Sequence, residues 1–181
     1  NDLSEISKYM AISMSINVSA RQFGESTFVD KMNKMLAETA VNPNQVRLEI
    51  TESMVMDNVE KTIEKMKVLA QQGISFSMDD FGTGYSSLAY LKRLPVDLLK
   101  IDKSFVLDIT NDSNDAVIVE TILAMAQHMQ VDVVAEGVES AEVLEFLKSK
   151  GCRKFQGYLF NRPMPFDELL KLIADNLRLV S

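Results

Sequence analysis

Two adjacent aspartates, Asp79 and Asp80, follow an apolar stretch and lead into a loop that contains Gly82 and Gly84. Hard divalent cations such as Mg²⁺ bind carboxylate oxygens and commonly share them with the phosphate groups of a substrate. If the apolar stretch is a strand of a parallel sheet, the pair lies at its carboxyl end, where α/β proteins bind ligands. An Asp-Asp pair in a glycine-rich turn is also common without any function. The other polar residues therefore decide between the two interpretations.

Two glutamates, Glu49 and Glu52, lie at the end of the preceding apolar segment. Four carboxylates on neighbouring strand ends repel one another unless cations or protons hold them together. We therefore expect metal ligands among Glu49, Glu52, Asp79 and Asp80, with Asn17 as a neutral oxygen ligand from the strand before. The alternatives are a solvated strand end, or a position of Glu52 in the first turn of a helix.

Three further polar residues end apolar segments. Lys100 lies within Leu-Leu-Lys-Ile, where a lysine is costly unless it is paired, so its amine should meet carboxylates or a bound phosphate. The alternative is a side chain that reaches past the rim of the fold into solvent. Glu136 ends a buried stretch before Gly137, and Gln156 is placed to hold a substrate or a water molecule.

Several common chemistries are excluded by composition. His128 is the sole histidine and is predicted to lie on the surface, which excludes zinc sites built on histidines and a Ser-His-Asp triad. Cys152 has no second cysteine to pair with and is interpreted as a packing residue, as expected in a reducing cytoplasm. The Gly82 loop lacks the Gly-Lys-Ser/Thr of a phosphate-binding P-loop.

The whole chain has the composition of one soluble domain over residues 1–181. Its net charge of −7 argues against binding along DNA or RNA, but permits a small anionic substrate if metal ions neutralise the site. No apolar run approaches the roughly 20 residues of a membrane span. We expect this segment to lie in the cytoplasm and to make no membrane contact. It can be the cytoplasmic part of a larger, membrane-anchored protein.

Strand and helix patterns alternate along the chain, which predicts βαβ units and a parallel sheet. An open doubly wound sheet and a (β/α)8 barrel both fit this rhythm, but polar residues at nearly every strand end favour a barrel, which gathers all strand ends around one mouth. A complete barrel takes about 250 residues, so roughly two βα units are absent. The expected strands are 12–16, 46–50, 74–78, 98–101, 131–135 and 154–159, and the expected helices are 28–40, 57–72 with Asp57 as its cap, one through Leu94, 116–130, 140–150 and 167–177.

Taken together, these motifs resemble the bacterial EAL domain, a family of cyclic di-GMP phosphodiesterases built on a modified TIM barrel. The resemblance covers essentially the whole chain, in the family's order and spacing. Its motifs are Ser15–Ser19, Leu48–Ser53, Asp79–Leu88, Leu99–Asp102, Val134–Glu139 and Gln156–Tyr158.

The resemblance implies hydrolysis of cyclic di-GMP to linear pGpG with Mg²⁺ or Mn²⁺, most simply two ions. It assigns Lys100 to orienting the attacking water, Glu136 to supporting the metal site, and Gln156 to positioning water or substrate. The loop 81–87 resembles the loop that couples metal binding to a dimer interface in the family. The implied metal-site residues are Asn17, Glu49, Glu52, Asp79, Asp80 and Glu136.

The chain departs from the family pattern because the Glu-Ala-Leu strand does not occur in it. The chain then corresponds to the last three quarters of an EAL domain, truncated at the N-terminus to about six βα units. We expect little activity from it alone, and an exposed sheet edge that favours a homodimer or a swapped assembly. Two other functions remain open, a cyclic di-GMP receptor without catalysis and a purely structural module.

Overall fold

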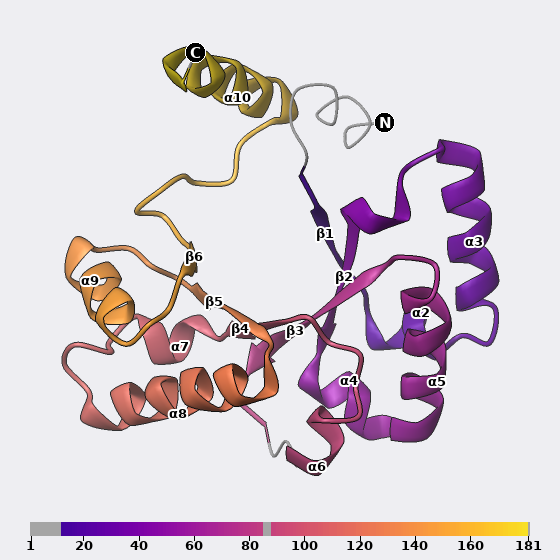
Figure 1. The fold of residues 1–181 in the computed structure, drawn as a ribbon, viewed down its shortest axis with the longest axis horizontal. Helices are drawn as coiled ribbons and strands as arrows, with labels where there is room; N and C mark the ends of the chain where they lie inside the picture. Colours follow the sequence, from indigo (N-terminus) through magenta and orange to yellow (C-terminus); the bar gives the residue numbers. More distant parts are fainter. Residues whose placement is uncertain (1–11, 85–87, 181) are drawn as a thin grey trace.

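The computed structural model describes residues 12–84 and 88–180, and in this part of the chain six parallel strands form one sheet. The strands follow one another in sequence order, each paired with the next. Figure 1 shows the sheet curling, as expected for part of a TIM-type barrel. The prediction of a truncated α/β barrel is therefore confirmed. The strands are β1 (Met14–Asn17), β2 (Val46–Thr51), β3 (Ser75–Phe81), β4 (Leu98–Ile101), β5 (Asp132–Glu136) and β6 (Lys154–Gln156).

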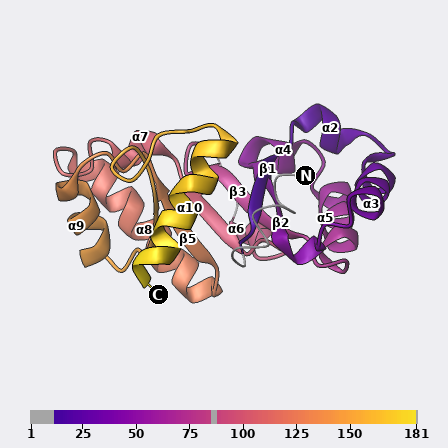
Figure 2. The same ribbon diagram turned by 90° about the horizontal axis from the view of Figure 1, so that it is seen from above.

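Helices connect the strands and cover the outer face of the sheet. Figures 1 and 2 show α3 and α5 beside the first strands and α8 and α9 beside the last, whereas α10 stands apart from them. In the described residues, no helix is both long and apolar enough to cross a bilayer. The helices are α2 (Ala20–Gly24), α3 (Phe28–Thr39), the 3₁₀ turn η1 (Pro43–Gln45), α4 (Glu52–Asp57), α5 (Val59–Ala70), α6 (Leu88–Leu91), α7 (Lys103–Val106), α8 (Ser113–Met129), α9 (Ala141–Ser149) and α10 (Phe166–Val180).

The two faces of the strands differ in polarity, and this difference positions the site. Successive side chains on a strand point to opposite faces. Leu48, Phe76 and Leu99 are at most 1% exposed in the core under the helices, where burying each contributes about 2 kcal/mol. The neighbouring positions Glu49 and Lys100 point to the other face, inside the curl of the sheet. The apolar outer layer thus holds a row of polar groups in place.

Two strands end three residues away from the predicted end, whereas the other strand ends lie within two residues of the prediction. β3 continues to Phe81 because Phe81 is buried and pairs with Ile101 of β4, so Asp79 and Asp80 lie inside the strand rather than in the loop after it. β6 stops at Gln156, short of the predicted residue 159, because the backbone then bends back so that Leu159 N donates to Val138 O at 3.0 Å.

Several helices also differ from the prediction. The helix expected at 57–72 is α5, which begins at Val59 and is capped by Asn58, not Asp57, because the Asn58 side chain accepts from Lys61 N at 3.3 Å. The separate helix α4 precedes it and ends at Asp57. The helix expected through Leu94 is only the short α6. The short helices α2 and α7 have no counterpart among the predicted elements.

Candidate metal centre

Lys100 is the centre of a buried ion cluster. Its Nζ lies 2.7 Å from Glu49 Oε2, 2.9 Å from Asp79 Oδ1 and 2.7 Å from Glu136 Oε1. The residue is only 6% exposed, so the predicted contact with carboxylates is confirmed and the alternative of a solvent-reaching side chain is wrong. The four side chains of this cluster come from four neighbouring strands, β2 to β5.

The charges of the cluster do not balance. Burial works against the charge of Lys100, but hydrogen bonds to Glu136, Glu49 and Asp79 outweigh it and raise the lysine pKa above its ordinary value. Burial raises the pKa of Glu136, although the hydrogen bond from Lys100 opposes the shift. One ammonium facing three carboxylates leaves an excess of negative charge when all are ionised. Such a cluster attracts a further cation.

A second group of carboxylates overlaps the first. Asp79, Asp80 and Glu136 each offer an oxygen, and these oxygens lie within 4.8 Å of one another. Neighbouring residues of a regular strand point to opposite faces, but the β3–β4 register shifts between Met78 and Phe81, and Asp80 has a left-handed φ of 52°. The irregular backbone therefore lets both aspartates reach the same site.

Asp80 is also held by a residue that the sequence reasoning did not single out. Asp102 shares a side-chain hydrogen bond with Asp80, and burial and the neighbouring carboxylates Asp79 and Asp102 raise the pKa of Asp80. Burial works against the charge of Asp102, but hydrogen bonds from Ser104 keep the Asp102 pKa below its ordinary value. The sequence signal that could have identified Asp102 is its position two residues after Lys100, directly after the end of the same apolar strand.

Glu52 begins α4 and is buried, and within residues 12–84 and 88–180 neither of its carboxylate oxygens has a hydrogen-bond partner. The backbone at Gly84 passes so close that a Cβ there would lie 2.6 Å from Glu52 Oε1. A buried carboxylate is costly without donors or a cation. Glu52 is thus in the first turn of a helix, as one of the alternative interpretations had it, yet it is not solvated. Residues 85–87 of the predicted coupling loop lie outside the described residues.

Asn17 and Gln156 lie at the carboxyl ends of the outermost described strands. Asn17 is in register with Glu49, and Gln156 with Glu136. Both side chains are exposed. The remaining predictions on polar residues concern positions far from this end of the sheet: His128 is exposed, and Cys152 is buried at 4% exposure, as predicted.

The residues present fit a hard divalent cation. Every donor in the group of Asp79, Asp80 and Glu136 is a carboxylate oxygen, the ligand type that Mg²⁺ and Mn²⁺ prefer. In the part of the chain that the structure describes, no group donates to the two buried oxygens of Glu52, which leaves them available to a donor or a cation. Lys100 supplies one positive charge to three carboxylates, so the cluster carries a net negative charge when all of them are ionised.

Fold and site together define an α/β barrel-type protein with an acidic, oxygen-rich centre at the carboxyl ends of its strands. The chain belongs to the EAL domain family, whose sequence pattern matches residues 1–163. Among curated proteins, the chain is 44% identical over 156 residues to the cyclic di-GMP phosphodiesterase NbdA of Pseudomonas aeruginosa. That match covers 86% of this chain but 20% of NbdA, so the chain spans about a fifth of this relative.

Solved structures agree with this assignment. The structure titled PaMucR phosphodiesterase, c-di-GMP complex, superposes with a TM-score of 0.88 at 40% identity, covering 93% of this chain and 68% of that one. The manganese/cy-diGMP complex of Klebsiella pneumoniae BlrP1 superposes with a TM-score of 0.76 at 34% identity, covering 83% of this chain and 39% of that one.

Proposed function

We propose that the domain to which this chain belongs hydrolyses cyclic di-GMP to linear pGpG with Mg²⁺ or Mn²⁺, using two ions. The observation that carries this proposal is the overlap of two clusters, Lys100 among its carboxylates and the group of Asp79, Asp80 and Glu136. The names of the relatives support the substrate, since NbdA and MucR are cyclic di-GMP phosphodiesterases and BlrP1 was solved with manganese and this dinucleotide.

The metal-holding side chains in this proposal are Asn17, Glu49, Asp79, Asp80 and Glu136, with Glu52 buried behind the loop at Gly84. When bound, the ions lower the pKa of a coordinated water and neutralise the phosphate. Asp79 and Glu136 belong to both clusters, so both would hold metal, and Asp102 fixes the direction of Asp80 through their hydrogen bond.

Lys100 and Gln156 act on water and substrate in this proposal. All three protons of the lysine ammonium are used by Glu49, Asp79 and Glu136, which fixes its position. If one of these carboxylates turned towards a bound cation, the N–H of Lys100 that it had accepted from would be free to donate a hydrogen bond to the attacking water. Gln156, exposed beside Glu136, has an amide free to hold the water or a phosphate oxygen. Hydrolysis adds one water across a P–O bond.

The proposal extends to the wider setting of the chain. Residues 1–181 are one EAL-type domain unit that lies in the cytoplasm, does not bind DNA or RNA, and assembles as a homodimer or by exchange of strands. Asn17 and Gln156 lie on strands that pair on one side only within the described residues, β1 with β2 and β6 with β5. We propose that this chain alone has little activity.

The test compares cyclic di-GMP hydrolysis by this chain and by a longer protein that extends it at the amino end, each with Mg²⁺ or Mn²⁺. Turnover by the longer protein, abolished by Asp79→Asn, is the expected result. Asp132→Asn is the matched control, because Asp132 pairs with Lys154 on the surface at the start of β5. Unchanged turnover in Asp79→Asn would overturn the metal assignment. If both this chain and the longer protein bind cyclic di-GMP but neither hydrolyses it, the domain is a receptor instead.

A further inference from the structure

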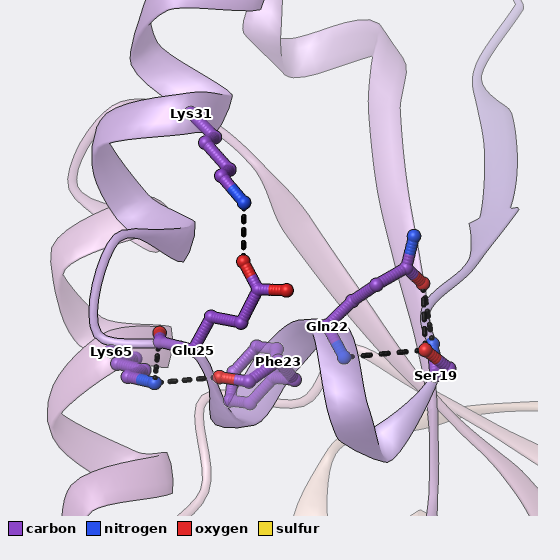
Figure 3. A network of polar contacts seen from close by, with 6 residues as sticks. All are labelled: Ser19, Gln22, Phe23, Glu25, Lys31 and Lys65. Carbon is purple, nitrogen blue, oxygen red and sulfur yellow. Dashed lines mark hydrogen bonds and ion pairs between the residues drawn. The ribbon is translucent and has the colours of Figure 1, made fainter.

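Lys65 of α5 contacts the end of a different helix, the five-residue α2. Its Nζ donates to the backbone oxygens of Phe23 at 2.6 Å and Glu25 at 2.8 Å, and lies 5.6 Å from the centre of the Phe23 ring (Figure 3). The last carbonyls of a helix have no partner within it, and a cation there is favourable. Lys65 therefore caps the carboxyl end of α2, although it lies about 40 residues further along the sequence.

The amino end of α2 is fixed as well. Ser19 Oγ accepts from Gln22 N at 3.3 Å, and Ser19 N donates to Gln22 Oε1 at 3.2 Å, which is a complete capping box (Figure 3). Phe23, the fourth of the five residues of α2, is 4% exposed and packs on Phe28 with ring centres 5.0 Å apart. One helical turn is not stable by itself, so these contacts set the position of α2.

The position of α2 matters because Asn17 lies two residues before its cap. Asn17 ends β1, and Val18 N donates to Glu49 O at 3.0 Å, so the backbone at Asn17 is held by β2 on one side and by α2 after it. A cavity of about 210 Å³ separates α2 from α4 and α5, and both Lys65 and Met54 of α4 line it. The contacts of Lys65 are therefore with α2, the element that directly follows the strand carrying Asn17.

We propose that Lys65 is a positioning residue for the metal centre: by holding the end of α2, it fixes the direction in which Asn17 leaves β1. This inference rests on the proposed function. It assigns Lys65 no contact with metal or substrate. The expected signature is therefore a loss of metal affinity with little change in turnover once metal is saturating.

The test uses the longer, metal-binding protein and Mn²⁺ as the probe, titrated by calorimetry. Lys65→Met keeps the apolar stem but removes both hydrogen bonds, and should weaken Mn²⁺ binding roughly threefold to tenfold, below the effect of a direct outer-shell partner. Lys65→Arg, which can donate to both carbonyls, should restore the affinity. Lys61→Met is the matched control, because Lys61 lies on the same helix and lines the same cavity.

Ser19→Ala removes the cap at the other end of α2 and should also weaken Mn²⁺ binding. It keeps the inference testable if the Lys65→Met protein does not fold. An affinity in Lys65→Met equal to that of Lys61→Met would overturn the inference, as would wild-type affinity in Ser19→Ala. Equal losses in Lys65→Met and Lys65→Arg would do the same. Absence of Mn²⁺ binding and of turnover in the unmodified longer protein would overturn the proposed function and this inference with it.

Discussion

At the scale of single residues, the site depends on a buried lysine whose charge is matched by several acids. Lys100 and Glu49 are both about 8% exposed at their side chains, so water screens their interaction poorly. Removal of one partner from a buried ion pair leaves an uncompensated charge, which costs more than the pair itself contributes. Lys100 is therefore needed for folding as well as for the proposed chemistry.

We expect Lys100→Met to lower the free energy of unfolding by about 3 kcal/mol in the absence of metal, because one buried and two half-buried carboxylates lose their cation. Urea denaturation with a chelator present measures this change. Lys154→Met is the control, since Lys154 and Asp132 are 49% and 64% exposed, and loss of such a surface pair costs less than about 1 kcal/mol. Equal, small losses in both variants would show that the Lys100 cluster is not a buried ion pair in solution.

Cys152 gives a residue-scale prediction that does not involve the metal centre. Burial raises the pKa of its thiol, and each unit of such a shift cuts the thiolate fraction at neutral pH about tenfold. A disulfide reagent at pH 7 should therefore label the native chain far more slowly than the same chain in urea. Because the folded-state pKa lies above the unfolded one, the stability that this group contributes is lost as the pH rises into the alkaline range. Equal labelling rates would contradict the buried position.

The sequence predicted that Lys100 contacts carboxylates, but not how many of them it contacts. A lysine in an apolar strand must find acids, and Lys100 does. That it finds three depends on how far the sheet curls between β2 and β5, which no local pattern encodes. Likewise, the left-handed φ of Asp80 follows from the register shift against β4. The role of Asp102 arises from the same irregular backbone.

At the scale of elements, the helices α3, α8 and α9 were predicted and the short helices α2 and α7 were not. α3 and α9 have an apolar periodicity that specifies them locally, and the four-residue strand β4 was predicted from its apolar run. By contrast, α2 and α7 have five and four residues, and α2 depends on distant contacts such as those of Lys65. A helix stabilised from outside leaves little signal in its own sequence.

The ends of β5 and β6 give a prediction at this scale. Val138 N donates to Gln156 O at 3.1 Å, and a Cβ on Gly157 would lie 2.2 Å from Val138 O. Because the obstacle is backbone, Gly157→Ala should destabilise the fold by about 2 kcal/mol and, in the longer protein, lower turnover by displacing Gln156. Thermal unfolding and hydrolysis assays measure the two effects.

The matched control for Gly157→Ala is Gly24→Ala, which also adds one methyl group. A Cβ on Gly24 meets no atom within 4 Å, and the residue lies in α2. This change should be neutral, or stabilising by about 0.5 kcal/mol through a less flexible unfolded chain. A Gly157→Ala protein as stable as the control would refute the close approach of the two loops.

At the scale of the whole molecule, the described sheet is open. Within residues 12–84 and 88–180, β1 pairs on one side only with β2, and β6 with β5. Apolar side chains lie at both edges: Ile16 on β1 is 41% exposed, and Tyr158 and Phe160 after β6 are 52% and 48% exposed. An exposed strand edge with apolar neighbours is a template for pairing with another chain.

We therefore expect this chain alone to self-associate through its strand edges, with an average mass that rises with concentration in size-exclusion chromatography with light scattering. Ile16→Lys should lower that mass, because a charge on an edge strand opposes pairing. Val117→Lys is the control, since Val117 is 63% exposed but lies on helix α8. A chain that stays monomeric at every concentration, or an equal effect of the two lysines, would contradict association through the β1 edge. Dissociation by Ile16→Lys alone would locate the contact at the strand that carries Asn17, and would make the outer strand of the proposed metal centre the place where two copies meet.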